Sequence, residues 1–421
     1  MTERLLQFIW QFQYFNRQAL CTRDGSALQV LQPGKYNTHQ GPDFLTASIR
    51  IGSTLLVGHV ELHLRTSDWQ KHGHQADANY KNVVLHVVWQ HDDTLEAPHL
   101  PLLELQHRVP NLLLQQYNDW MQQSSFVACA AGIKNVSALV WLSWNERLLA
   151  ERLQRKSAYV LQLLEQNQVH WQETCWQMLA RNFGMQVNAD AFEGIARSIP
   201  MAVLLRHKNQ LTVLEALLLG QAGLLTDAPA DAYTSLLQRE YQFLQHKYQL
   251  KRPPMPVFFL RMRPAAFPSL RLAQLAMLFH QCSHFFAAIA EASQVQEVMA
   301  LLSVQANDYW HYHYSPGVLS AYKVKTLGKA MIHNIIINTV APLLFAHGLY
   351  HHEEKQKEKA LRWLEALPPE KNSLCSGWQA LGMPNKNAFH SQALIELKTR
   401  YCDEKKCLDC AVGNALLKRT V

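Results

Sequence analysis

The sequence has no uninterrupted apolar run of about 18 residues, which is the length that a membrane-spanning helix requires. Its longest apolar stretch, 331–349, is broken by His333, Asn334, Asn338 and Pro342, and this pattern predicts a buried helix instead. The sequence also opens without the cationic and apolar leader that directs secretion. These absences predict a cytoplasmic protein with no membrane partner.

Cysteine is sparse and unevenly placed. The chain of 421 residues has eight cysteines, and three of them, Cys402, Cys407 and Cys410, stand together near the C-terminus. Grouped thiols in a reducing compartment favour a metal site over a disulfide framework. With Cys375 as the natural fourth ligand and His390 as a further option, this pattern predicts a structural zinc ion or a 4Fe-4S cluster. The alternative is that they are ordinary reduced thiols.

Several enzyme motifs are missing as well. The chain has no Walker A, dinucleotide-binding or nucleophile-elbow pattern, and no convincing internal repeat or low-complexity tract.

Its 48% hydrophobic content is enough to bury a core, and its length suggests two or three domains. A formal net charge of +7 permits nucleic-acid binding through phosphate contacts without requiring it.

Alternating patterns near the N-terminus indicate β-strands. Residues 45–51 place apolar side chains on one face, and 54–65 alternates in the same way after a short turn, so the two should pair as an antiparallel hairpin. The stretch 82–90 is almost wholly apolar, which indicates a strand buried on both faces. An amphipathic helix at 3–15 and a short strand at 28–31 precede these strands.

Helical periodicity replaces the strand pattern beyond Pro110. The expected helices are 138–166, 170–182, 190–199, 209–219, 231–248, 268–292, 295–304, 328–346, 353–367 and 391–400. The proline-rich segment 251–256 is a predicted boundary or rigid linker. We therefore expect three successive domains, 1–110, 111–250 and 251–421.

Two carboxylates in the N-terminal region form the strongest candidate site. Asp43 starts one predicted strand, and Glu61 and His63 lie on the same face of the next strand. Hard oxygen ligands of this kind suit Mg²⁺ or Mn²⁺. In the alternative reading, Asp43 caps a turn and Glu61 lies on a solvated face.

A loop rich in ligand side chains follows these strands. His72, His74 and Asp77 follow the second strand of the hairpin, where they can fold back over the carboxylates as further metal ligands. For any one histidine alone, a purely structural role is the competing interpretation.

Three arginines form a second candidate site. Arg261, Arg263 and Arg271 stand near a predicted helix start, where phosphate can bind. The alternative for these arginines is a set of salt bridges between helices.

The order helix, strand, strand, strand, with Pro42-Asp43 heading one strand and Glu61-x-His63 inside the next, resembles the PD-(D/E)xK nuclease superfamily. The resemblance covers about the first 110 residues and implies a restriction-endonuclease-like domain in which Asp43 and Glu61 hold the metal. His63 occupies the position where that superfamily usually has lysine, and a histidine is largely neutral at pH 7. In many members a glutamate of the first helix joins the site, which here would be Glu3.

Over nearly its full length, the chain resembles a family of uncharacterised bacterial proteins classified as a domain of unknown function. The residues that carry this resemblance are Asn37, 41–44, 58–63, 67–69, His72, His74, Asp77, 261–264 and the terminal cysteines. The family implies no activity.

The sequence as a whole predicts an α+β protein, with a restriction-endonuclease-like α/β domain followed by a large, mainly α-helical region. The expected activity is metal-dependent hydrolysis of nucleic-acid phosphodiester bonds, with DNA favoured over RNA as the partner. His63 would assist the attacking water or the leaving group. Two alternatives stay open, a catalytically inactive nucleic-acid-binding protein and a His-rich metallo-hydrolase of a small substrate.

Overall fold

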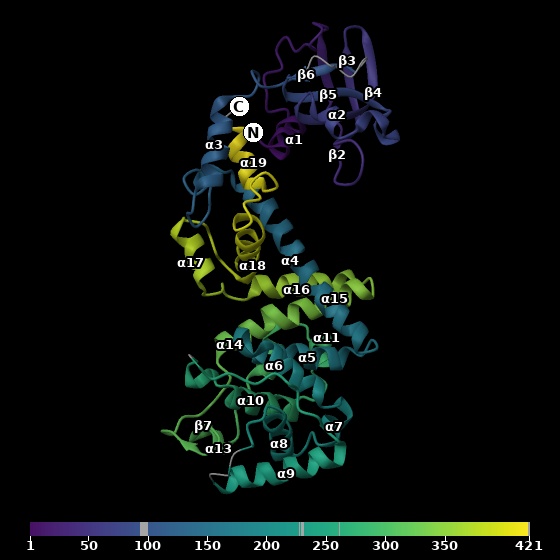
Figure 1. Cartoon of the computed structure of the whole chain (residues 1–421). Coiled ribbons are helices and arrows are strands. Elements are labelled where there is room, and N and C mark those ends of the chain that lie inside the picture. The colour runs from purple at the N-terminus through teal and green to yellow at the C-terminus, as the bar shows by residue number, and fades with distance from the viewer. Residues whose placement is uncertain (93–99, 227, 229–230, 261, 420–421) are drawn as a thin grey trace. The chain divides into compact units, whose positions relative to one another are not determined.

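The computed structural model describes residues 1–92, 100–226, 228, 231–260 and 262–419. The predicted α+β class is confirmed, since a sheet near the N-terminus is followed by a mostly helical chain (Figure 1). The chain divides into two compact units. Unit 1 comprises Met1–Glu146, Ser376–Met383 and Leu394–Val421, and unit 2 comprises Arg147–Cys375 and Pro384–Ala393.

These units differ from the three successive domains that the sequence predicts. The proline-rich segment 251–256 lies inside unit 2 and marks no boundary between units. The C-terminal segment Leu394–Val421 belongs to the same unit as the N-terminus, although unit 2 separates them in sequence. Composition along a chain reveals linkers, but it does not reveal that a late segment packs with an early one.

The core of unit 1 is a mixed sheet with the strand order β1-β3-β4-β5-β6, to which β2 adds by pairing with β3 (Figure 1). Its strands are β1 (Leu28–Gln32), β2 (Lys35–Tyr36), β3 (Phe44–Ile51), β4 (Thr54–Arg65), β5 (Val83–Gln90) and β6 (Leu102–Glu104). The predicted β3–β4 hairpin is confirmed as antiparallel, whereas β5 runs parallel to both β4 and β6. Helix α1 (Glu3–Phe12) packs against β4 through its apolar face.

A bulge near the start of β3 changes which side chains are buried. Phe44 pairs with Val60 but Ala47 pairs with Gly58, so β3 has one more residue here than β4. Thr46 takes a positive φ of 54° at this point. Phe44 and Ala47 are therefore both buried, which strict alternation from 45 to 51 does not predict. The bulge follows Asp43 directly and sets the direction in which the strand enters the sheet.

The parallel connection from β4 to β5 carries three short helices, α2 (Asp68–Lys71) and the 3₁₀ helices η1 (His74–Ala76) and η2 (Ala78–Tyr80). Gly58 of β4 allows β4 and β5 to approach closely where β5 begins. A Cβ atom built on Gly58 would lie 2.4 Å from a methyl carbon of Val84 and 2.5 Å from the carbonyl oxygen of Asn82. Any larger residue would push the strands apart.

Unit 1 continues after the sheet with helices from both ends of the chain. It contains α3 (Asn111–Gln122), the 3₁₀ helix η3 (Ile133–Asn135), the π-helix η6 (Lys398–Cys402) and α19 (Ala411–Lys418). Helix α19 packs against α3 and η3, and the blue and yellow helices lie side by side in Figure 1. Three further helices, α4 (Ala138–Gln166), α17 (Ser373–Ala380) and α18 (Ala388–Leu397), contain residues of both units.

In the described residues of unit 2, the chain is helical apart from one small hairpin of β7 (His313–Ser315) and β8 (Val318–Leu319). Its helices are α5 (Trp171–Phe183), α6 (Met185–Ser198), α7 (Met201–Arg206), α8 (Leu211–Gln221), α9 (Ala232–Tyr248), η4 (Pro264–Ala266), α10 (Pro268–Gln281), α11 (Phe285–Glu291), α12 (Val295–Leu302), α13 (Asp308–His311), α14 (Lys329–Ile335), η5 (Ile336–Val340), α15 (Ala341–Tyr350) and α16 (Glu354–Ala366).

Of two long helices predicted in unit 2, one is broken by a bend and the other is buried as expected. The predicted helix 268–292 is wrong as one element, because α10 and α11 meet at an angle of 66°. Cys282 has extended backbone angles there, and the carbonyl of Ser283 accepts a hydrogen bond from Gln172 of α5 instead of continuing the helix. The stretch Lys329–Tyr350 is long and apolar enough to cross a membrane, but 67% of its apolar window is buried inside the protein, as predicted for a core helix.

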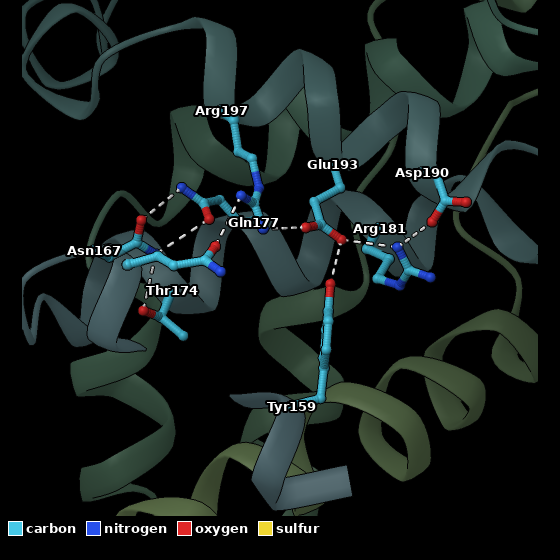
Figure 2. A network of polar contacts seen from close by, with 9 residues as sticks. Tyr159, Asn167, Thr174, Gln177, Arg181, Asp190, Glu193 and Arg197 are labelled. Carbon is cyan, nitrogen blue, oxygen red and sulfur yellow. Dashed lines mark hydrogen bonds and ion pairs between the residues drawn. The ribbon is translucent and has the colours of Figure 1, made fainter. Parts of the chain in front are cut away.

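A polar network joins α4, α5 and α6 of unit 2 (Figure 2). The carboxylate of Glu193 accepts hydrogen bonds from Tyr159 at 2.5 Å, from Arg181 at 2.8 Å and from Arg197 at 2.5 Å. Burial raises the pKa of Glu193, but these three donors outweigh it and hold the pKa below 4.5. Since Glu193 is only 7% exposed, its charge stabilises the fold only while these donors are in place.

Replacing this carboxylate should destabilise the protein in a pH-dependent way. We expect Glu193→Gln to lower the free energy of unfolding by about 1–3 kcal/mol at pH 7, the usual range for hydrogen bonds to a charged group. Folding lowers the pKa of Glu193, so its contribution is complete above pH 4.5 and is lost as the pH falls through the folded-state pKa. Urea unfolding at pH 7 and pH 3.5 measures both effects.

Glu151→Gln is the matched control for this substitution. Glu151 pairs with Arg147 at 2.8 Å, but the Arg147 side chain is 65% exposed. Exposed pairs contribute below about 1 kcal/mol. An equal loss of stability in both variants, or a Glu193→Gln effect that does not shrink in acid, would contradict the predicted role of the network.

Candidate metal centre

The predicted carboxylate pair, Asp43 and Glu61, is brought together at the end of the hairpin away from its turn, where β3 begins beside β4. The backbone N–H of Asp43 donates to Oε2 of Glu61 at 3.0 Å, and the backbone N–H of Leu62 donates to Oδ2 of Asp43 at 3.1 Å. Gln7 of α1 donates to the other oxygen of Asp43 at 2.8 Å. Three of the four carboxylate oxygens are thus held by hydrogen bonds, and Oε1 of Glu61 is left to face the loop between β4 and β5.

Histidines from the strand and from the loop converge on that oxygen. Nε2 of His63 lies 3.6 Å from Oε1 of Glu61, and Nε2 of His74 lies 3.4 Å from it. Ligand atoms of His63, His72 and His74 all lie within 4.8 Å of one another. Within the described part of the chain, both Nε2 atoms are buried without a hydrogen-bond partner. Buried polar atoms normally have partners, so this arrangement indicates a missing ligand.

A buried histidine of β5 fixes the orientation of His63. Nδ1 of His63 lies 2.9 Å from Nε2 of His86, which is only 2% exposed. This hydrogen bond occupies one ring nitrogen of His63 and leaves the other to face Glu61. Metal-ligating histidines are generally held in this way by a second group behind them. The ring of His74 is held differently, by stacking on Tyr80 with the ring centroids 3.9 Å apart.

Burial dominates the electrostatics of the centre. It raises the pKa of Asp43, and it raises the pKa of Glu61, which the neighbouring Asp43 charge raises further. Burial also lowers the pKa of His63, and the surrounding histidines lower it further. Burial lowers the pKa of His74 as well, so the rings of His63 and His74 are neutral and able to donate lone pairs, while the raised pKa of Asp43 and Glu61 shows that these carboxylates lack a compensating cation. Both conditions match a site that binds a divalent metal ion.

The glutamate of the first helix also reaches this region. The charge of Glu3 raises the pKa of both Asp43 and Glu61, and the charge of His72 lowers the pKa of Glu3, which burial raises. Glu3 and His72 are both exposed, so this side of the centre is open to solvent. A substrate can approach the centre from here.

The donor set identifies the kind of metal that fits. Imidazole nitrogens suit Zn²⁺ and carboxylate oxygens suit Mg²⁺ or Mn²⁺. A site with up to three imidazoles beside Glu61 suits Mn²⁺ or Zn²⁺ better than Mg²⁺, which prefers oxygen ligands and keeps much of its water. The two unpartnered Nε2 atoms support this fit.

The loop residues proposed as ligands have different positions. His72 and His74 join His63, as the sequence predicts. Asp77 does not belong to this group, because its carboxylate caps η2 by accepting hydrogen bonds from the backbone and side chain of Asn79. An aspartate before a short helix often has this capping role.

Sequence reasoning does not select every residue that contacts the predicted site. Gln7, Tyr80 and His86 are examples of contacts absent from its set of site residues. Gln7 lies one helical turn after Glu3, so the two share a face of α1 and the signal was available. No local pattern marks His86 as a partner of His63, because that contact depends on β5 pairing in parallel with β4.

The cysteines proposed as one centre fall in different units. Cys402, Cys407 and Cys410 belong to unit 1. Cys375 belongs to unit 2, where it is buried and has Asn372, Asn385 and Ser391 as its neighbours.

The proposed phosphate-binding arginines have no common setting. Arg261 lies outside the described residues. Arg263 precedes η4, and Arg271 is largely enclosed within α10, where it donates to Gln274 at 3.0 Å. Burial lowers the pKa of Arg271 to about 10. This location favours a structural role for Arg271.

Metal binding tests the histidine cluster directly. We expect the full chain to bind one Mn²⁺ ion at this centre, and His63→Ala or His74→Ala to weaken the affinity by at least about 10–100-fold, as losses around a metal ligand do. Isothermal titration with Mn²⁺ measures this, because Mn²⁺ binds poorly to the thiolates elsewhere in the chain. His91→Gln is the control, since His91 contacts Thr66 at 2.9 Å outside the cluster. Unchanged affinity in both alanine variants would refute the site.

Comparison with known proteins gives one match. Residues 3–373 match the model of a family described as protein of unknown function (DUF2851). No curated protein and no solved structure gives a match. Since the matched region covers most of the 421 residues, the chain belongs to the DUF2851 family.

Proposed function

We propose that this protein is a divalent-metal-dependent phosphodiesterase that acts on nucleic acid, with Mn²⁺ or Zn²⁺ held by Glu61, His63 and His74 and assisted by Asp43 and His72. One observation carries the proposal. The buried carboxylate of Glu61 faces His63 and His74, whose buried Nε2 atoms lie 3.6 Å and 3.4 Å from it without a hydrogen-bond partner among the described residues. This is an electron-rich group of donors that lacks a cation.

The chemistry needs such a cation. A divalent ion bound here would polarise a phosphate and lower the pKa of an attacking water. The protein itself supplies the positioning. Gln7 and the backbone of Leu62 hold Asp43, the backbone of Asp43 holds Glu61, and His86 holds His63. These groups are fixed before a substrate arrives, so little reorganisation is needed at the reacting atoms.

His63 has a different role from the lysine that the resembled nucleases carry at this position. A lysine offers a permanent positive charge, but burial lowers the pKa of His63 and keeps its ring neutral. A neutral ring can be a ligand. The loop supplies two more histidines, so His63, His72 and His74 act together as a nitrogen-rich side of the centre. We therefore assign His63 to metal binding, not to charge stabilisation.

Nucleic acid is the proposed substrate class for two reasons. The net charge of +7 favours approach to a phosphate backbone. The arrangement of Pro42-Asp43 and Glu61-x-His63 on adjacent antiparallel strands resembles that of PD-(D/E)xK nucleases. The exposed side of the centre, at Glu3 and His72, leaves space for a long substrate.

Cleavage assays with two near-isosteric variants test the activity. We expect the full chain to cleave DNA in Mn²⁺ or Zn²⁺, and Asp43→Asn and Glu61→Gln to reduce the rate by at least about 100-fold, since even groups behind the ligands contribute 10–100-fold. Single- and double-stranded DNA and RNA should be compared with bis-p-nitrophenyl phosphate. His91→Gln should keep the wild-type rate, and circular dichroism should show that all variants are folded.

The outcomes separate the alternatives. Cleavage that survives in both carboxylate variants would show that the activity comes from elsewhere. Binding of nucleic acid without cleavage in any metal would identify an inactive binding protein. Hydrolysis of the small ester alone would identify a metallo-hydrolase of small substrates.

A further inference from the structure

The four cysteines that lie together in unit 1 are not the four that spacing along the sequence selects. Cys402 ends the π-helix η6, Cys407 lies in the following turn, and Cys410 is the N-cap of α19. The fourth is Cys129, which lies in a turn between α3 and η3. All four belong to unit 1, and none forms a disulfide.

Packing of α19 brings the two segments together. Gly132 lies next to Leu416, because a Cβ atom on Gly132 would be 3.1 Å from a methyl carbon of that leucine. Gly413 lies so close to the Cys407 carbonyl that a Cβ atom there would be 2.2 Å from its oxygen. Gly413 allows the N-terminal turn of α19 to pack on the segment that carries Cys407, which is possible only without a side chain there, and Gly132 packs the segment that carries Cys129 against Leu416 of the same helix.

Burial and neighbouring cysteines raise the pKa of Cys402 and of Cys129. Burial raises the pKa of Cys402, and Cys410, Cys129 and Cys407 raise it further. Burial also raises the pKa of Cys129, with Cys410 and Cys407 adding to the effect. Cys375 is not among the groups that act on these thiols.

Hydrogen-bond donors and cations surround the sulfurs. Burial raises the pKa of Cys410, but the backbone N–H groups of Gly413 and Val412 and the side chain of Trp144 donate toward its sulfur. Lys398 and Lys405 act in the same direction on Cys402 and Cys407. Donors and positive charges around grouped, buried thiols are what thiolate ligands require.

The spacing of the sulfurs indicates the size of the centre. Among the described residues, no three of these four sulfur atoms all lie within 4.8 Å of one another. A zinc ion with Zn–S bonds of about 2.3 Å would place four sulfurs about 3.8 Å apart. A cluster of several irons needs more room between its ligands.

We propose that Cys129, Cys402, Cys407 and Cys410 bind one 4Fe-4S cluster that fastens the turn between α3 and η3 to the start of α19. The proposal replaces Cys375 with Cys129 as the fourth ligand. It does not depend on the proposed hydrolase activity.

The segment that carries these cysteines also contacts α1, the helix that contacts Asp43. Arg4 of α1 forms an ion pair with Asp409, which lies between Cys407 and Cys410. Tyr14, just after α1, donates to Asn414 of α19 at 2.6 Å. Gln7 and Glu3 stand on the same α1 and reach Asp43 and Glu61. The cluster would therefore hold the segment on which α1 rests.

Composition and spectroscopy of the full chain test the cluster. Protein purified without oxygen should be brown and contain about four iron and four sulfide per chain. Cys129→Ser should lose most of the iron and the visible absorption, whereas Cys375→Ser should retain both. Colourless protein without iron, stoichiometric zinc in place of iron, or loss of iron in Cys375→Ser but not in Cys129→Ser would each overturn the proposal.

Alkylation provides a second measurement that needs no variant. Cys129, Cys402 and Cys407 are only partly buried, but burial raises the pKa of bare thiols there, so an alkaline buffer is needed for them to react with iodoacetamide. In that buffer we expect them to be protected in the iron-containing protein, and to react after the iron is removed by oxidation and chelation. Exposed Cys21 should react in both states. Labelling of the three cysteines in the iron-containing protein would refute their role as ligands.

Discussion

The burial of Asp43 and Glu61 beside each other is the constraint on which the N-terminal region depends. Two carboxylates removed from water repel one another and lack hydration, so each needs donors or a cation. The backbone N–H groups of Asp43 and Leu62 and the side chain of Gln7 satisfy three oxygens. The last oxygen faces neutral histidines that cannot supply charge while burial keeps their pKa low. A metal ion satisfies both sides of this arrangement at once.

The sheet topology determines which histidines take part. Because β4 and β5 run parallel, a connection has to cross from the end of one strand to the start of the other. That connection carries α2, η1 and η2, and it places His72 and His74 against His63 near the end of β4, with Tyr80 stacked on His74. An antiparallel hairpin here would be a tight turn without room for these residues. The parallel pairing is therefore the structural origin of the histidine cluster.

The sequence is sufficient to predict much of this region. Alternation and turn chemistry predict β3 and β4, and the carboxylates at their start and middle indicate the site. The bulge at Thr46 could not be predicted, because it interrupts the period that alternation relies on. His86 and Cys129 were missed for a different reason. Each meets its partners only through long-range packing, whereas spacing along the chain favours near neighbours such as Cys375.

Unit 1 combines the first and the last segments of the chain, so it can be completed only at the end of synthesis. Leu394–Val421 belong to unit 1, yet the ribosome makes them after the whole of unit 2. Domains generally fold as they emerge during synthesis. Unit 2 can therefore be complete while unit 1 still lacks α19 and the partners of Arg4 and Tyr14. The unit that carries the proposed metal centre is finished last, although its sequence begins first.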